Sequence, residues 1–306
     1  MTPRLIVTGY GGFVAGSVVW QALGSGQWDV YALSLTEPPE ERDGFRCIQF
    51  DLCDASALAG VVERVRPQAI IHTAAIADID FCQSHPREAN RVNAEVTSEL
   101  SRQCAKYGGK LILCSTDSVF DGKKGMYREE DEPHAINFYA HTKLHAEAAV
   151  REAAPDNVIV RLSLVMGLPV LGSGNSFLAK MVTTLEKGQP VTFPENEVRT
   201  PVDVITVGRA LLELADSGFS GTLHLAGNTR LNRYQMACQL AERMGYGRDL
   251  VVATDSNAIE GRAPRPNDAS LDNSKAQRIL ATPMRSLMDG LQLVLEAKET
   301  QRSEQS

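Results

Sequence analysis

Leu5-Ile-Val-Thr-Gly-Tyr-Gly-Gly-Phe-Val-Ala-Gly16 is the stretch that decides the fold. An apolar run stops abruptly at glycines, and a helical pattern of apolar residues follows. This order is typical of a strand, a phosphate-binding turn and a helix whose first N–H groups face the anion. Gly9 permits a tight turn, Gly12 lets the backbone approach a pyrophosphate, and Ala15 allows close helix packing. We therefore predict a dinucleotide site that includes Gly9, Gly11, Gly12, Phe13 and Val14.

The composition is that of an ordinary globular protein. The 306 residues are 43% hydrophobic and 23% charged, with a formal net charge of −7. This acidic balance argues against wide contact with nucleic acid, which needs a basic face. No run approaches the ~18 apolar residues of a membrane span, and a strand begins at once, without a signal peptide. We expect a cytoplasmic protein with no nucleic-acid or membrane partner.

Cysteines and histidines give no sign of a metal site. The six cysteines lack C-x-x-C spacing and are expected to be reduced thiols. His141 and His145 lie four residues apart, as metal ligands can, but no third ligand is near them. We predict no metal.

Strand and helix patterns alternate along the chain, which indicates βαβ units. Strands are expected at 4–8, 29–34, 46–50, 68–73, 110–115 and 157–162, and helices at 12–24, 55–65, 87–107, 138–153 and 232–244. The predicted fold is α/β, a Rossmann-type doubly wound parallel sheet with a smaller C-terminal substrate-binding lobe. We assign 1–163 to the dinucleotide-binding domain, with part of 200–228 returning to it. We assign 164–296 mainly to the substrate-binding lobe and 297–306 to a flexible tail.

The ends of the second to fourth strands bear on the cofactor. The second strand ends without the acidic residue that usually meets a free ribose hydroxyl, so NADP(H) is favoured and NAD(H) stays open. Its phosphate has three candidate contacts: Ser34, Thr36 and Arg42. Asp51 and Leu52 follow the third strand, where the carboxylate can accept from an adenine amine. Small residues after the fourth strand let the cofactor lie close to the backbone at Ala74, Ala75 and Ile76.

The fifth strand and the helix after it carry the candidate chemistry. Leu111 to Asp117 delivers two hydroxyls and a carboxylate at the strand end. Tyr139 and Lys143 stand four residues apart on a helix that Asn137 can cap, so their side chains are neighbours. We expect the ammonium to lower the pKa of the phenol and so produce a general acid/base for a carbonyl or alcohol.

Together these motifs resemble the extended short-chain dehydrogenase/reductases. The segments Ser115 to Gly122, Tyr127 to Asp131 and Tyr139 to Glu147, with Arg199 to Asp203 and Arg265 to Asp272, are similar to the dTDP-4-dehydrorhamnose reductase family. The resemblance implies that Thr116 hydrogen-bonds the substrate carbonyl and that Tyr139 donates the proton. It also implies that Lys143 holds the nicotinamide ribose and that Asn93 supports the lysine and a water.

The chain departs from the family where the substrate would bind. Ser118 follows Ser-Thr-Asp where a tyrosine is common, and Leu164 stands where deoxysugar-binding members often have tryptophan. The reductase residues persist, but the aromatic wall that would pack a sugar ring is thinner. We predict that a small molecule, a nucleotide sugar above all, contacts Asp117, Ser118, Arg199 and Arg265. Arg199 and the pair Arg262 and Arg265 are the candidate diphosphate contacts, since arginine forks bind diphosphate.

Two other functions stay open. Tyr127 to Asp131, Tyr234 to Cys238 and Arg265-Pro266 also resemble the regulatory beta subunit of methionine adenosyltransferase, which keeps the reductase fold and NADP site but acts as a partner protein. A nucleotide-sugar epimerase or dehydratase is the third function, because Asp117 matches the extra acid of dehydratases. The sequence leaves a homodimer open.

Overall fold

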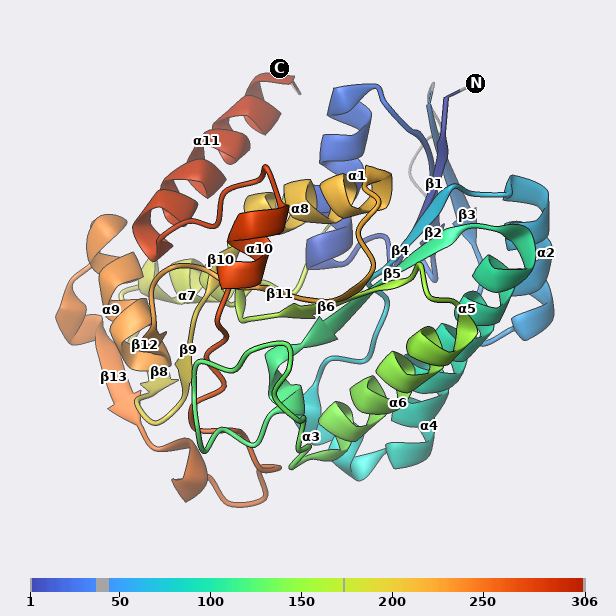
Figure 1. Cartoon of the computed structure of the whole chain (residues 1–306). Coiled ribbons are helices and arrows are strands. Elements are labelled where there is room, and N and C mark those ends of the chain that lie inside the picture. The colour runs from blue at the N-terminus through green and yellow to red at the C-terminus, as the bar shows by residue number, and fades with distance from the viewer. Residues whose placement is uncertain (1, 37–43, 173, 305–306) are drawn as a thin grey trace.

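The computed structural model describes residues 2–36, 44–172 and 174–304. Within these residues, seven parallel strands form the central sheet, in the spatial order β11-β6-β5-β4-β1-β2-β3 (Figure 1). Successive strands move outward in opposite directions from β1 and β4, so a crevice opens at their carboxyl ends, where such sheets bind ligands. The strands are β1 Arg4–Thr8, β2 Asp29–Ser34, β3 Phe45–Gln49, β4 Ala69–His72, β5 Lys110–Thr116, β6 Val158–Leu162 and β11 Gly221–Leu225.

Helices cover both faces of the sheet, so the central strands are almost continuously apolar. On one face, α1 (Phe13–Ser25) and α8 (Val204–Asp216) pack on one core cluster. On the other face, α2 (Ala55–Val65), α5 (Val96–Tyr107) and α6 (Phe138–Ala153) pack on a second (Figure 1). The predicted doubly wound α/β fold is confirmed.

The predicted helix 87–107 is a helical run with a π-helical turn inside it. Its parts are α4 (Pro86–Asn90), the π-helix η1 (Arg91–Glu95) and α5, with the short α3 (Ile79–Ser84) just before. Such π-turns often occur at functional sites. Here the turn carries Asn93, whose side chain is buried.

Elements after β6 build a smaller core beside the sheet, at the left of Figure 1. The chain nevertheless returns to the sheet at β11, which pairs with β6. Besides α8 and β11, the described elements after β6 are β7 Val165–Met166, α7 Phe177–Leu185, β8 Val191–Pro194, β9 Val198–Arg199, β10 Val202–Asp203, β12 Leu231–Asn232, α9 Arg233–Arg243, η3 Arg248–Leu250, β13 Val251–Thr254, η4 Ser256–Ala258, α10 Ser274–Ile279 and α11 Leu287–Glu304. The 3-10 turn η2 Asp117–Val119 lies earlier, directly after β5.

Most of the tail expected to be flexible, residues 297–304, is helical in the structure. Helix α11 continues to Glu304, and Ala297 and Gln301 on it are buried. Gln301 donates to the Val170 carbonyl, and Lys298 donates to the Pro169 carbonyl at 3.1 Å. The segment is polar in sequence but docks through long side chains, which a composition argument does not detect.

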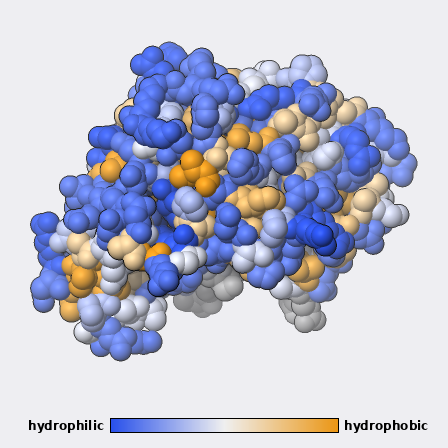
Figure 2. Space-filling model, turned by 90° about the horizontal axis from the view of Figure 1, so that it is seen from below, coloured by the Kyte–Doolittle hydropathy of each residue, from blue (hydrophilic) through white to orange (hydrophobic). Residues whose placement is uncertain are grey.

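Hydrophobic side chains on the face seen from below lie in small groups among hydrophilic ones (Figure 2). None of the described helices combines the length and apolar character that crossing a bilayer requires.

Candidate functional site

A cavity of about 570 Å³ lies at the carboxyl ends of β1, β2 and β4. The turn after β1 reaches the cavity because Gly9 has a φ of +76° and lies against β4's extension: a Cβ there would be 2.9 Å from the Ala74 Cα. Most residues expected to bind the cofactor line this cavity, namely Gly9, Gly12, Phe13, Val14, Asp51, Leu52, Ala74, Ala75 and Ile76.

Four residues expected at the cofactor are not among those that line this cavity, namely Gly11, Ser34, Tyr139 and Lys143. The Ser34 hydroxyl is buried and lies 3.0 Å from the Thr36 hydroxyl, while Leu33 and Leu35 face the cavity instead. The Gly11 carbonyl accepts from the Gly174 N–H at 3.3 Å, in the segment that crosses the glycine turn. Strand pleating places Leu33 and Leu35, and not Ser34, at the cavity. At Gly11, a segment distant in sequence, which includes Gly174, lies against the turn. Arg42 lies outside the described residues.

A second cavity, of about 500 Å³, adjoins the first and holds the candidate catalytic groups. Ala77 and Asn175 line both cavities, so a ligand in one can meet a ligand in the other. The residues expected at the substrate all line the second cavity, namely Thr116, Asp117, Ser118, Tyr139, Arg199 and Arg265.

Thr116 and Tyr139 meet at the wall of the second cavity. Thr116 ends β5, and Tyr139 lies in the first turn of α6, which begins where the Asn137 side chain accepts from the Ala140 N–H at 2.9 Å. Burial raises the pKa of the Tyr139 phenol, and the hydrogen bond with Thr116 lowers it only in part. The phenol is therefore protonated at neutral pH.

Lys143 is buried one turn further along α6 and lines neither cavity. Its Nζ donates to the Cys114 carbonyl at 2.7 Å, and burial lowers the pKa of the ammonium to about 8. The expectation that Lys143 lowers the pKa of Tyr139 is wrong for this structure, because the effect of burial on the phenol dominates and the ammonium is directed at β5.

Asn93 ties the loop after β4 to α6. Its amide oxygen accepts from the Ile76 N–H at 2.8 Å, and its amide nitrogen donates to the Ile76 carbonyl and to the Thr142 hydroxyl, both at 3.0 Å. Asn93 thus positions a cofactor-cavity residue and the neighbour of Lys143, without a direct bond to the lysine.

A buried histidine continues this network beneath the cavity. His72 lies with Nδ1 2.7 Å from the Thr8 hydroxyl and Nε2 3.0 Å from the Thr97 hydroxyl. Thr97 donates to the Asn93 carbonyl at 2.7 Å, so His72 must donate from Nε2 and accept at Nδ1. Burial, aided by the charge of Lys143, lowers the pKa of His72 to about 3. The network therefore requires neutral imidazole.

We expect the free energy of unfolding to fall as the pH drops from 7 to 5. Burial also lowers the pKa of His224 to about 3, so both histidines protonate in the unfolded chain before the folded one. Because the folded-state pKa is depressed, each neutral histidine contributes its full stability above pH 6.5, and the contribution is lost below that pH. At pH 5 the free energy of unfolding should be lower by about 2 kcal/mol for each histidine. Urea unfolding at several pH values measures the loss. The variant His72→Gln should show about half the pH slope; an unchanged slope would contradict the assignment.

The arginines of the second cavity are already paired within the protein. Arg265 forms a two-pronged ion pair with Asp80, at 2.6 and 2.7 Å, and Arg199 Nε lies 3.4 Å from Asp117. Arg233 and Glu197 also line the cavity and were not predicted from the sequence. Both belong to segments that approach only in the fold, where the Arg233 N–H donates to the Glu197 carbonyl at 3.0 Å.

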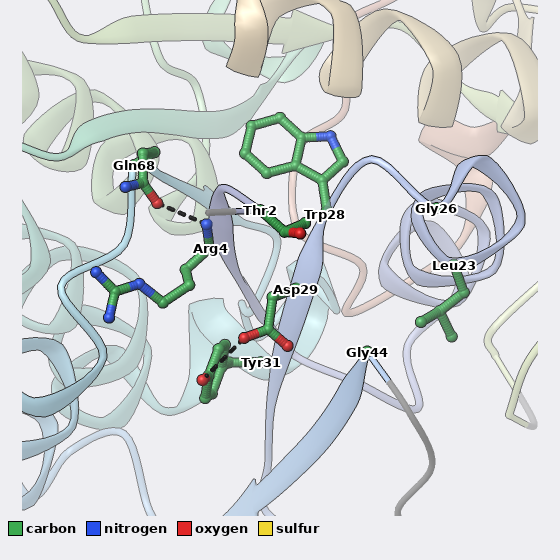
Figure 3. A pocket seen from close by; sticks show the side chains of 9 residues that line it. All are labelled: Thr2, Arg4, Leu23, Gly26, Trp28, Asp29, Tyr31, Gly44 and Gln68. Carbon is green, nitrogen blue, oxygen red and sulfur yellow. Dashed lines mark hydrogen bonds between the residues drawn. The ribbon is translucent and has the colours of Figure 1, made fainter.

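A third cavity, of about 620 Å³, lies away from this chemistry (Figure 3). It is at the amino ends of β1 and β2, where the Arg4 N–H donates to Gln68 at 2.5 Å and Tyr31 donates to Asp29 at 3.1 Å. Ligands of such sheets bind at the opposite edge.

The match of a family model to residues 3–300 decides the family. This chain belongs to the RmlD substrate binding domain family. It is 32% identical over 291 residues to the probable low-salt glycan biosynthesis reductase Agl14 of Haloferax volcanii, covering 93% of this chain and 95% of that protein. It is 30% identical to dTDP-4-dehydrorhamnose reductase of Mycobacterium tuberculosis (96% and 93% covered) and to methionine adenosyltransferase 2 subunit beta of Bos taurus (90% and 82% covered).

Solved structures agree in fold. The dTDP-4-dehydrorhamnose reductase of Bacillus anthracis in complex with NADP has a TM-score of 0.85 at 23% identity, covering 96% of this chain and 99% of that one. MoeE5 in complex with UDP-glucose and NAD has a TM-score of 0.80 at 23% identity, with 97% and 99% covered. The resemblance to extended short-chain dehydrogenase/reductases of the dTDP-4-dehydrorhamnose reductase type is confirmed.

Proposed function

We propose that this protein is an NADPH-dependent reductase that converts the ketone of a 4-keto nucleotide sugar into an alcohol. The observation that carries the proposal is the pair of joined cavities, one at the glycine turn and one with Thr116 and Tyr139 on its wall. The reductases among its relatives support this reading.

The protein's own groups would manage the oxygen of the ketone. Bound NADPH supplies the hydride. The residues that would hold it are those that line the first cavity. The Thr116 hydroxyl would hydrogen-bond the ketone oxygen, and the Tyr139 phenol would give that oxygen its proton. A phenol whose pKa burial has raised is protonated at neutral pH and so suits the reductive direction. Lys143 would bind the nicotinamide ribose only if its Nζ turned from the Cys114 carbonyl toward the first cavity.

The preference for NADPH over NADH rests on the first cavity. Among the described residues, its acidic lining residues are Asp51 and Glu88, and none comes from β2. One Asp51 carboxylate oxygen already accepts from the Cys53 N–H at 2.9 Å. Among the described residues, the end of β2 therefore offers no carboxylate to a ribose 2′-phosphate, whereas NAD-specific sites usually place one there.

The oxidation of NADPH at 340 nm tests the proposed function. The purified protein is assayed against a panel of 4-keto nucleotide sugars and simple ketones, with NADH in parallel. We expect turnover on a nucleotide sugar and a lower KM for NADPH than for NADH. Binding of NADPH with no turnover on the whole panel would exclude the reductase.

A regulatory role is the second candidate, because a methionine adenosyltransferase beta subunit is among the relatives at 30% identity. Such a protein would bind NADP and a synthetase catalytic subunit without turnover of its own. Size-exclusion chromatography with a purified synthetase catalytic subunit tests this role. A joint peak would support it, and separate elution together with ketone turnover would exclude it.

A further inference from the structure

The chain between β7 and α7 forms a loop that we call the strap; its described residues are 167–172 and 174–176. The Ser176 hydroxyl donates to the Gly167 carbonyl, so the two ends of the strap meet. The same hydroxyl accepts from the Ala179 N–H at 3.1 Å and so caps α7. The strap is therefore a closed loop whose base is fixed.

The strap lies on the glycine turn through backbone contacts. The Gly174 N–H donates to the Gly11 carbonyl at 3.3 Å. A Cβ at Gly172 would lie only 2.9 Å from the Gly11 carbonyl oxygen. In α1, a Cβ at Gly16 would overlap the Leu171 carbonyl oxygen. Because glycine has no Cβ, the two backbones can approach each other this closely.

An apolar cluster connects the glycine turn with the last helix. Val170 of the strap is only 3% exposed and belongs to one cluster with Val294 and Ala297 of α11. Phe13, which lines the first cavity, and Trp20 of α1 pack against the same cluster. The cluster therefore links α1, the strap and α11, three elements that are far apart in sequence.

Two polar side chains of α11 hold the strap by its carbonyl groups. The Lys298 ammonium donates to the Pro169 carbonyl at 3.1 Å, and the Gln301 amide donates to the Val170 carbonyl. Lys298 also donates to the Gln301 amide oxygen at 2.8 Å, which orients that amide. Carbonyls of a buried loop need partners that the loop cannot supply itself, and α11 provides them here.

We propose that Lys298 and Gln301 are positioning residues for the cofactor. Acting through the strap, they hold the glycine turn in the conformation that binds the pyrophosphate. The inference rests on the proposed function, which requires a dinucleotide in the first cavity. Neither residue lines that cavity, so both act at a distance. A turn that already has its bound conformation loses less freedom on binding, so the two residues raise the affinity for NADPH and not the rate of the chemistry.

Fluorescence titration of NADPH into the full chain tests the inference without turnover. Lys298→Met keeps the aliphatic stem and should raise the dissociation constant for NADPH about 10-fold, the equivalent of one net hydrogen bond. Gln301→Leu should change it in the same direction. Lys298→Arg keeps a donor and should stay within about threefold of the wild type. The matched control is Thr300→Ala, whose exposed hydroxyl donates only within α11, to the Glu296 carbonyl at 3.1 Å.

A second pair of variants approaches the strap from α1. Gly16→Ala places a methyl group against the Leu171 carbonyl and should also raise the dissociation constant for NADPH about 10-fold. Gly24→Ala, in the same helix, meets no atom within 4 Å and should keep the affinity of the wild type. Both changes improve helix propensity equally, so a difference between them reports the strap.

Two further measurements separate positioning of the turn from a general loss of structure. Adenosine 2′-phosphate lacks the pyrophosphate and should bind Lys298→Met and the wild type equally. Without any cofactor, the Gly174 N–H should exchange with solvent faster in Lys298→Met, whereas the amides of β5 should keep their protection.

The outcomes separate this inference from the proposed function. Equal NADPH affinity in the wild type, Lys298→Met and Gln301→Leu would overturn the positioning role and leave the reductase to the ketone assay. An equal loss of affinity for adenosine 2′-phosphate would also overturn it, because the whole cavity would then be disturbed. A wild type that binds no NADPH would contradict both the positioning role and the proposed function. Weaker NADPH binding in the variants, with no ketone turnover in the wild type, would support the strap and contradict the reductase.

Discussion

Replacing Tyr139 with phenylalanine is expected to lower kcat by about 10³-fold, within the usual range for loss of a general acid. The phenol hydroxyl is the titratable group that hydrogen-bonds Thr116 at the cavity wall, so its removal leaves the developing alkoxide without a proton. Tyr139 does not line the first cavity, and the dissociation constant for NADPH should change by less than about threefold. Initial rates and fluorescence titration of NADPH measure the two quantities.

Tyr246 provides the matched control. It lies just beyond α9 and outside both cavities, so Tyr246→Phe should keep the kcat of the wild type. Turnover that survives in Tyr139→Phe would show that another group gives the proton. Loss of NADPH binding together with turnover would show that the variant disturbs the cofactor cavity rather than the chemistry.

The sheet could be predicted because its cause is local. Strands covered on both faces read as short apolar runs, and glycine at the first turn is required by a positive φ that other residues rarely adopt. The same logic placed Thr116 and Asp117, because a strand end at the carboxyl edge must face the ligand crevice. Strand positions and the first cavity therefore follow from residues that are neighbours in sequence.

The pairings of charged groups could not be predicted, because they join segments far apart in the chain. Asp80 and Arg265 are 185 residues apart, and nothing in the sequence indicates that the Asp80 carboxylate forms an ion pair with the Arg265 guanidinium. The pKa of Tyr139 is set in the same way, since burial by surrounding segments outweighs any neighbour on its own helix. The sequence places Arg233 in the first turn of a predicted packing helix. In the structure, the pairing of β12 with β9 brings Arg233 beside Glu197.

The largest loss of stability is expected from Glu147→Gln, one turn beyond Lys143 on α6. The Glu147 side chain is fully buried, and both oxygens are in use: Ser115 donates at 2.7 Å, and Arg161 donates from Nε at 3.1 Å and from NH2 at 2.9 Å. Arg161 is itself only 2% exposed, and its NH1 already lacks a partner. Removing the carboxylate leaves a buried guanidinium without its counter-charge.

We expect the free energy of unfolding to fall by about 3–5 kcal/mol in Glu147→Gln, the usual loss when one member of a buried pair is removed. Glutamine has nearly the same shape, so the loss reports charge rather than a cavity, and urea unfolding at pH 7 measures it. Glu152→Gln, on an exposed position of the same helix, should lose less than about 0.5 kcal/mol. If Glu147→Gln lowered the free energy of unfolding as little as Glu152→Gln does, water would have to reach Arg161 and contradict its burial. Neither Glu147 nor Arg161 lines either cavity, so the folded variant should keep the KM for NADPH of the wild type. An unchanged KM would show that Glu147 supports the fold and does not act on the cofactor.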